Sequence, residues 1–174
     1  MPRQNILGLL EGGDRRSIGR ADQVAAAVSM NQALFPELMQ GWWSENPLVR
    51  MRAADATEKI TRKNPHLLRS YKRDLLALMA EAKQQELRWH LAAMVPRLVL
   101  TSKERHLVYS LLSRYLEDRS SIVKTCALQA LADLATDDSN IRAGVIEILR
   151  QSTRNGTPAM KARSRKLLFH LEQL

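Results

Sequence analysis

Rows of four mostly apolar residues recur four times along this chain, each with internal steps of 4, 3 and 4 residues. This spacing places side chains on one face of an α-helix. Successive rows begin 38, 36 and 37 residues apart, and only Ser164 interrupts their apolar character. The rows are Val49, Ala53, Ala56 and Ile60; Leu87, Leu91, Met94 and Leu98; Val123, Ala127, Ala130 and Leu134; and Met160, Ser164, Leu167 and Leu171. The pattern predicts repeated helical units.

A second apolar anchor lies 11 residues before the start of each row, at Leu38, Leu76, Leu112 and Leu149. Each unit therefore has two helices joined by a turn. A period in the high thirties with two helices is typical of α-solenoids, in which each hairpin buries its apolar faces against its neighbours. Such arrays usually present an extended binding surface and not a catalytic pocket.

The pattern also predicts the organisation of the chain. We expect an all-α fold with an N-terminal helical cap at 1–29 and four helical hairpins at 30–174. The hairpins should occupy about 30–65, 66–101, 102–140 and 141–174. In the cap, ADQVAAAV is predicted to be helical, and GGDRRSIG to be a turn. That turn lacks the GxxxxGK[ST] order of a phosphate-binding loop.

Three local features lead to more specific expectations. Trp42 falls four residues after Leu38, in the core register, so we expect it to be buried. Ser102 is the expected N-cap of the third hairpin, and Pro96 should kink the helix that contains it. The single cysteine, Cys126, excludes an internal disulfide and should be a packed thiol.

Two segments, WWSENPLVRMRAADATEKI and LEDRSSIVKTCALQALADLA, resemble HEAT repeats, and the likeness covers roughly residues 30–174. The family pattern has a turn or an acidic residue before a Val-Arg pair, then Ala positions and a Leu. The corresponding pairs are Val49-Arg50, Leu87-Arg88, Val123-Lys124 and Met160-Lys161. The resemblance implies a right-handed α-α superhelix.

HEAT proteins commonly pair an Asp, five residues before the Val, with a basic residue of a neighbouring repeat. The resemblance therefore assigns this role to the residues at that position, which are Ser44, Ala82, Asp118 and Asn155. Only Asp118 carries the acid. The basic residues of the repeats are under-neutralised as a result.

These basic residues form a ladder along the second helices. The position after each row start holds Arg50, Arg88, Lys124 and Lys161, and the position two further on holds Arg52, His90, Cys126 and Arg163. Because helices pack about 8–10 Å apart, the ladder should extend about 30 Å. The ladder either pairs within the stack or binds an acidic ligand. For binding, the candidate residues are Arg50, Arg52, Arg88, Trp89, Lys124, Lys161 and Arg163.

The net charge of +9 favours an acidic partner. We expect a non-catalytic scaffold that holds an acidic segment of a protein; the alternative is a nucleic-acid-binding module. The resemblance also brings in alkylation-repair DNA glycosylases, some of which are HEAT-like, with Trp89, Arg88 and Asp55 as the nearest candidates. This function is less favoured, because no acidic residue follows Trp89 in its own helix. The four histidines lack zinc-site spacing, and no GxSxG motif is present. No metal, cofactor or membrane span is expected, and the composition predicts a cytoplasmic protein.

Overall fold

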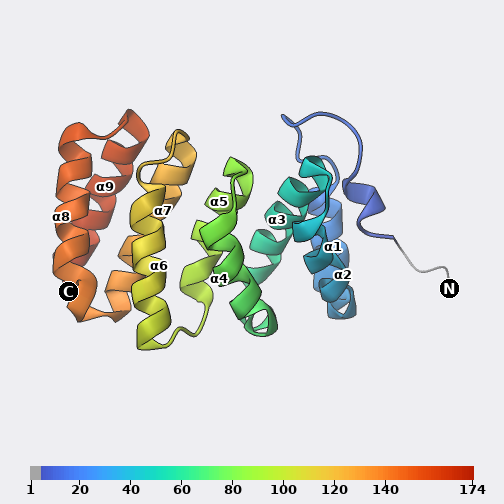
Figure 1. Cartoon of the computed structure of the whole chain (residues 1–174), viewed down its shortest axis with the longest axis horizontal. Coiled ribbons are helices and arrows are strands. Elements are labelled where there is room, and N and C mark those ends of the chain that lie inside the picture. Colours follow the sequence, from blue (N-terminus) through green and yellow to red (C-terminus); the bar gives the residue numbers. More distant parts are fainter. Residues whose placement is uncertain (1–4) are drawn as a thin grey trace. The chain divides into compact units, whose positions relative to one another are not determined.

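The computed structural model describes residues 5–174, and all its regular elements there are helical. This confirms the predicted all-α class; residues 1–4 of the predicted cap lie outside the described part. The chain divides into two compact units, the first ending at Lys72 and the second spanning Arg73–Leu174 (Figure 1). None of the described helices combines the length and the apolar character that crossing a bilayer requires.

The first unit is built around one central helix, α3. Its elements are η1 (Gly8–Leu10), α1 (Ala21–Met30), η2 (Gln32–Leu34), α2 (Phe35–Gln40), η3 (Gly41–Trp43), α3 (Pro47–Thr61) and η4 (Pro65–Tyr71), where η marks a 3-10 helix. Helix α3 packs against α1, η1, α2 and η3. The predicted cap and the predicted first hairpin therefore share one core.

The helix predicted over QALFPELMQGWW is divided into η2, α2 and η3. Pro36 lies in the first turn of α2, where its missing N–H costs no helical hydrogen bond. Trp42 is fully buried, as predicted, and its Nε1 donates to Thr57 Oγ1 at 3.0 Å. This bond joins η3 to α3.

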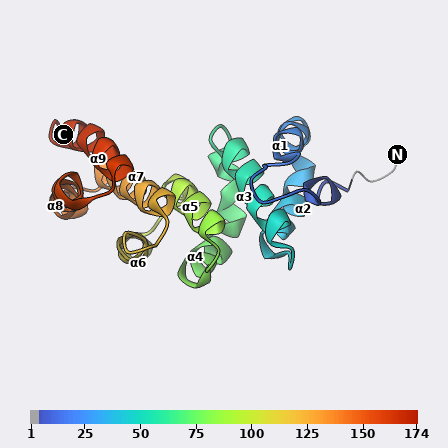
Figure 2. The same ribbon diagram turned by 90° about the horizontal axis from the view of Figure 1, so that it is seen from above.

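Every regular element of the second unit is helical. Its elements are α4 (Lys72–Glu81), α5 (Gln85–Met94), η5 (Val95–Arg97), α6 (Ser102–Tyr115), α7 (Ser121–Asp137), α8 (Ser139–Asn155) and α9 (Pro158–Leu171). Helix α7 packs between α5 and α9 and also contacts α6 and α8. Figure 2 shows α5, α7 and α9 in one row and α4, α6 and α8 in another. The helices α5, α7 and α9, which carry three of the apolar rows, are therefore neighbours in chain order.

Every residue of the four apolar rows is buried. Ser164, the one polar member, is fully buried too, and its Oγ has no hydrogen-bond partner in the part of the chain that the structure describes. The 4, 3, 4 spacing thus identified the core-facing side of each second helix.

Two expectations about helix ends need correction. The N-cap of α6 is Thr101 and not Ser102: Thr101 Oγ1 accepts from the Glu104 N–H at 3.2 Å, and Glu104 Oε2 accepts from the Thr101 N–H at 2.7 Å. This reciprocal pair needs a spacing of three residues, which Ser102 does not have. Pro96 does not kink α5, because α5 ends at Met94 and the chain continues as the 3-10 helix η5.

Candidate functional site

The candidate basic residues of the first unit are engaged within their own unit. The Arg50 guanidinium turns back toward the loop before α3, and Nη1 donates to the carbonyl oxygens of Ser44 at 2.6 Å and Glu45 at 3.0 Å. Arg50 is half-buried there. Its charge stabilises the turn that leads into the helix.

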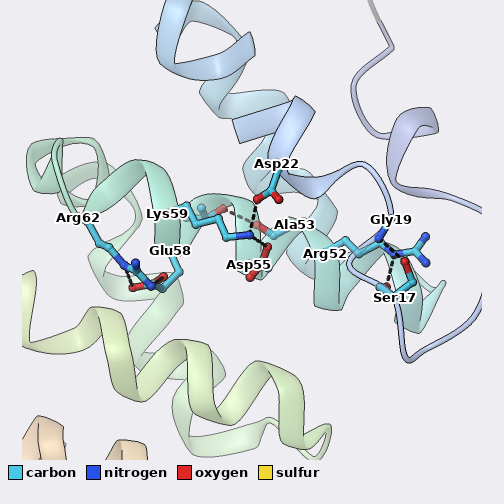
Figure 3. A network of polar contacts seen from close by, with 10 residues as sticks. Ser17, Gly19, Asp22, Arg52, Ala53, Asp55, Glu58, Lys59 and Arg62 are labelled. Carbon is cyan, nitrogen blue, oxygen red and sulfur yellow. Dashed lines mark hydrogen bonds and ion pairs between the residues drawn. The ribbon is translucent and has the colours of Figure 1, made fainter. Parts of the chain in front are cut away.

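Arg52 points into the protein, where it is 1% exposed. Its Nη1 donates to Leu10 O at 2.7 Å and Gly12 O at 2.6 Å, and Nη2 donates to Asp14 O at 3.1 Å. Its Nε donates to Ser17 O at 3.2 Å (Figure 3). Arg52 therefore offers no surface to a partner, contrary to its place among the candidate binding residues, and it is excluded from the site proposed below.

The GGDRRSIG loop folds around this guanidinium. Gly19 has φ +54°, and a Cβ atom there would lie 2.8 Å from Arg52 Cζ, so the close approach requires glycine. The loop turns carbonyl oxygens toward a cation, whereas a phosphate cradle presents N–H groups. This segment is a structural turn, as its sequence favours.

Asp55, the only candidate acid for glycosylase chemistry, belongs to an ion-pair cluster on α3 and α1. Lys59 Nζ lies 2.7 Å from Asp55 Oδ2 and 2.5 Å from Asp22 Oδ1 (Figure 3). Burial acts to lower the pKa of Lys59, but the hydrogen bonds to Asp22 and Asp55 outweigh it and raise the pKa. Asp55 is thereby paired with a cation inside its own unit.

In the second unit, Arg88 pairs with Asp118, the acid that the repeat pattern singled out. Arg88 Nη1 donates to Asp118 Oδ2, and Nε donates to Ala82 O at 2.7 Å. The Arg88 guanidinium carbon also lies 5.6 Å from the centre of the Tyr115 ring, within cation–π range. The pairing that the resemblance implied is present at this one junction.

Asp118 has a pKa below its usual value. Burial would raise this pKa, but the Ser120 N–H and the Arg88 guanidinium donate to the carboxylate and together outweigh burial. Lys124 lowers the pKa further through its charge, although the two side chains form no ion pair within residues 5–174. The ionised carboxylate is thus the form that the fold stabilises.

Asp118→Asn should lower the free energy of unfolding at pH 7 by about 1–3 kcal/mol, the usual effect of losing hydrogen bonds to a charged group. A depressed native pKa stabilises the fold at pH values above the unfolded pKa of about 4, and this contribution is lost as the pH falls through the native pKa. Urea unfolding of both proteins between about pH 7 and pH 2 measures the difference. A difference that persists undiminished at the acid end would contradict this assignment.

The ladder residues of the last two hairpins lie at the starts of α7 and α9. Lys124 and Lys161 are both half-buried. Neither forms an ion pair within residues 5–174, and the acid position of the last hairpin holds Asn155. These two cations lack the carboxylate that Arg88 has.

Arg163 joins a polar cluster that the sequence did not predict. Arg163 Nη1 donates to Gln129 Oε1 at 2.7 Å, and Gln129 Nε2 donates to Asp133 Oδ1 at 2.8 Å, which links α9 to α7. Burial raises the pKa of Asp133, against the opposing effects of Gln129 and Arg163. Gln129 lies six residues after the row start Val123, and the equivalent positions hold Asp55, Ala93 and Lys166, so the repeat pattern gave no consistent signal for this cluster.

Helix α9 carries the densest positive charge of the second unit. It contains Lys161, Arg163, Arg165 and Lys166 and no acidic residue. Arg165 and Lys166 are exposed, and neither forms an ion pair in the described structure. Trp89, the remaining candidate, is half-buried on α5, with its ring 5.7 Å from that of His90.

No cluster of three His, Cys, Asp or Glu side chains suitable for a metal ion occurs within residues 5–174.

The structure separates the predicted basic candidates into two groups. Arg50, Arg52 and Arg88 are committed to contacts within the fold, whereas Lys124, Lys161 and Arg163 lie on α7 and α9. Comparison of the sequence with models of known protein families gives no match, and comparison with curated proteins gives none either.

Proposed function

We propose that this chain is a non-catalytic protein-interaction module in which α9, together with the start of α7, holds an acidic segment of a partner protein. We call the surface residues that carry this proposal the basic face; they are Lys124, Lys161, Arg163 and Lys166. We further propose that the fold is a HEAT-like α-solenoid. The chain-order packing of α5, α7 and α9 and the Arg88–Asp118 pair support that reading.

The observation that carries the functional proposal is the uneven neutralisation of the ladder within the second unit. Arg88 has a carboxylate partner, since Asp118 accepts from it. Lys124, Lys161 and Lys166 have no such partner in the described structure, and α9 has no acidic residue of its own. Unpaired cations on neighbouring helices attract and orient a negatively charged segment.

Asp133 limits where that segment can lie. Its carboxylate is held by Gln129 and is close enough to Arg163 for the charge of Arg163 to affect its pKa. An acidic partner is repelled by Asp133 and attracted by Lys124, Lys161 and Lys166. The partner segment is therefore expected along the starts of α7 and α9 and along the exposed side of α9.

A fluorescein-labelled poly-glutamate peptide provides a direct test by fluorescence anisotropy. Reversing two charges, in Arg163→Glu/Lys166→Glu, should weaken binding by about tenfold or more, because attraction becomes repulsion at both positions. The matched control is Lys63→Glu/Lys103→Glu, which makes the same change in net charge at two exposed lysines outside the basic face. Equal weakening by both variants would show that only net charge matters, and would overturn the proposal.

Random duplex DNA, titrated in parallel, separates the proposed function from nucleic-acid binding. Contact with four phosphates predicts a log–log salt slope of about −3.6. If DNA binds more tightly than poly-glutamate at about 150 mM salt and shows that slope, the ligand class is nucleic acid and the protein-binding proposal is wrong.

A further inference from the structure

Two successive hairpin junctions of the second unit can be compared position by position. The first junction has Arg88, Tyr115 and Asp118. The equivalent residues of the second junction, 36 or 37 residues later, are Lys124, Ser152 and Asn155. The first junction, which has a cation, an aromatic ring and a carboxylate, can therefore serve as the reference for the second.

The first junction is closed by its own side chains. The Tyr115 ring lies beside the Arg88 guanidinium, with 5.6 Å between the guanidinium carbon and the ring centre, and its hydroxyl donates to Met79 O at 2.7 Å. Asp118 supplies the carboxylate that Arg88 binds. The cavity that remains at this junction is about 190 Å³.

The second junction lacks both of these groups. Ser152 has no ring to fill the space, and Asn155 has no charge to pair with Lys124. An open cleft of about 360 Å³ lies there, with Lys124, Ser152 and Asn155 in its lining. Its apolar wall consists of Leu116, Ile148 and Met160. We call this the Lys124 cleft.

The carboxylate of Asp118 does not compensate for this loss. Asp118 already accepts hydrogen bonds from Arg88 and from the Ser120 N–H, at 2.7 Å for the latter. It acts on Lys124 only through space, since the two form no ion pair in the described residues. Lys124 therefore keeps its capacity to bind a carboxylate of a partner.

We infer that the Lys124 cleft binds a peptide segment in which a carboxylate adjoins an aromatic side chain, so that the partner supplies the two groups missing from this junction. The inference rests on the proposed function and names the part of the partner that is recognised. The carboxylate pairs with Lys124, and the ring packs against the apolar wall of the cleft. A volume of this size lies within the range of about 300–1,000 Å³ that is usual for ligand sites.

The probe is N-acetyl-aspartyl-tyrosine amide, added to the full chain labelled with ¹⁵N and observed by NMR. Binding in the cleft should shift the amide signals of Ser152, Asn155 and Gly156. The asparaginyl analogue of the probe lacks the charge and should bind the wild-type protein about tenfold more weakly. The aspartyl probe should bind the Lys124→Gln variant about tenfold more weakly than it binds the wild type.

Closing the cleft provides a second, independent test. Ser152→Tyr/Asn155→Asp supplies the ring and the carboxylate that the first junction has, so it should abolish the probe-induced shifts while keeping the thermal midpoint at or above that of the wild type. Lys103→Gln, at an exposed lysine of α6, is the matched control for Lys124→Gln and should bind the probe normally.

The outcomes separate this inference from the proposed function. If poly-glutamate binds the basic face but the probe leaves the cleft signals unchanged, or still binds the folded closure variant, the cleft assignment is wrong and the proposed function stands. If inorganic phosphate shifts the same signals as strongly as the probe, the cleft is a general anion site and the peptide assignment is overturned. If neither poly-glutamate nor the probe binds, both fail.

Discussion

Arg52→Ala is expected to lower the free energy of unfolding by about 2–4 kcal/mol, although Arg52 lies outside the basic face. Four hydrogen bonds from one guanidinium hold the carbonyl oxygens of Leu10, Gly12, Asp14 and Ser17. A hydrogen bond of a charged group makes a net contribution of about 1.5–3 kcal/mol to stability. The four bonds of Arg52 should contribute less than the sum of four such values, because water can reach the exposed loop and replace part of each bond.

The loss of these bonds should also free the loop itself. The segment contains Arg15, Arg16 and Arg20, all exposed, so trypsin can cleave it as soon as its backbone leaves the folded conformation. Limited proteolysis of Arg52→Ala should give early cleavage in this loop, before the second unit is cut. Mass spectrometry of the first fragments identifies the sites.

Arg52→Lys and Arg50→Ala serve as matched controls for this prediction. A single ammonium group cannot reach four separate carbonyl oxygens, so Arg52→Lys should resemble Arg52→Ala more than the wild type. Arg50→Ala removes an arginine of the same helix that donates to Ser44 O and Glu45 O, and it should leave the cleavage pattern of the GGDRRSIG loop unchanged. If Arg52→Ala resists trypsin as well as the wild type does, the structural role assigned to Arg52 is contradicted.

Trp42→Ala is expected to have the largest effect of any single substitution considered, about 3–5 kcal/mol of unfolding free energy. Trp42 belongs to η3, which packs against α3, and its side chain is completely buried, so its removal leaves a cavity in the first unit. The substitution also takes away the donor to Thr57 Oγ1. Urea unfolding followed by far-ultraviolet circular dichroism measures the loss without depending on tryptophan fluorescence.

Trp42→Phe separates the two causes of that loss. Phenylalanine keeps most of the apolar contact but has no N–H, so the expected loss is about 1–2 kcal/mol. Trp43→Ala, at the adjacent and 48% exposed tryptophan, should change stability by about 0.5 kcal/mol or less. A larger effect at Trp43 than at Trp42 would contradict the observed burial.

Periodicity in the sequence was sufficient to locate the four helices that carry the apolar rows, and their buried sides. The apolar rows mark the second helices α3, α5, α7 and α9, and every row residue is buried. This works because a helix repeats every 3.6 residues, so local spacing alone decides which side chains share a face. Burial of Trp42 followed from the same register.

Helix ends were less predictable where the competing signals lay a single residue apart. Thr101 and Ser102 are both good capping residues, and the choice between them depended on which one is three residues before Glu104. Pro96 has no N–H to continue the α-helical hydrogen bonds, so α5 ends at Met94 and the chain continues as the 3-10 helix Val95–Arg97.

The sequence by itself determined the helical class, the repeat spacing and the surplus of basic residues. The tertiary structure alone decided what each basic residue does: Arg52 and Arg163 occupy the same position of the repeat, yet one is buried under a loop 35–42 residues away and the other reaches Gln129 on a neighbouring helix. The physical reason is that a charged side chain is neutralised by whatever the fold brings near it, and such partners are distant in the chain. Local spacing places a cation on a helix face, and only packing determines whether a carbonyl, a carboxylate or an open cleft lies opposite.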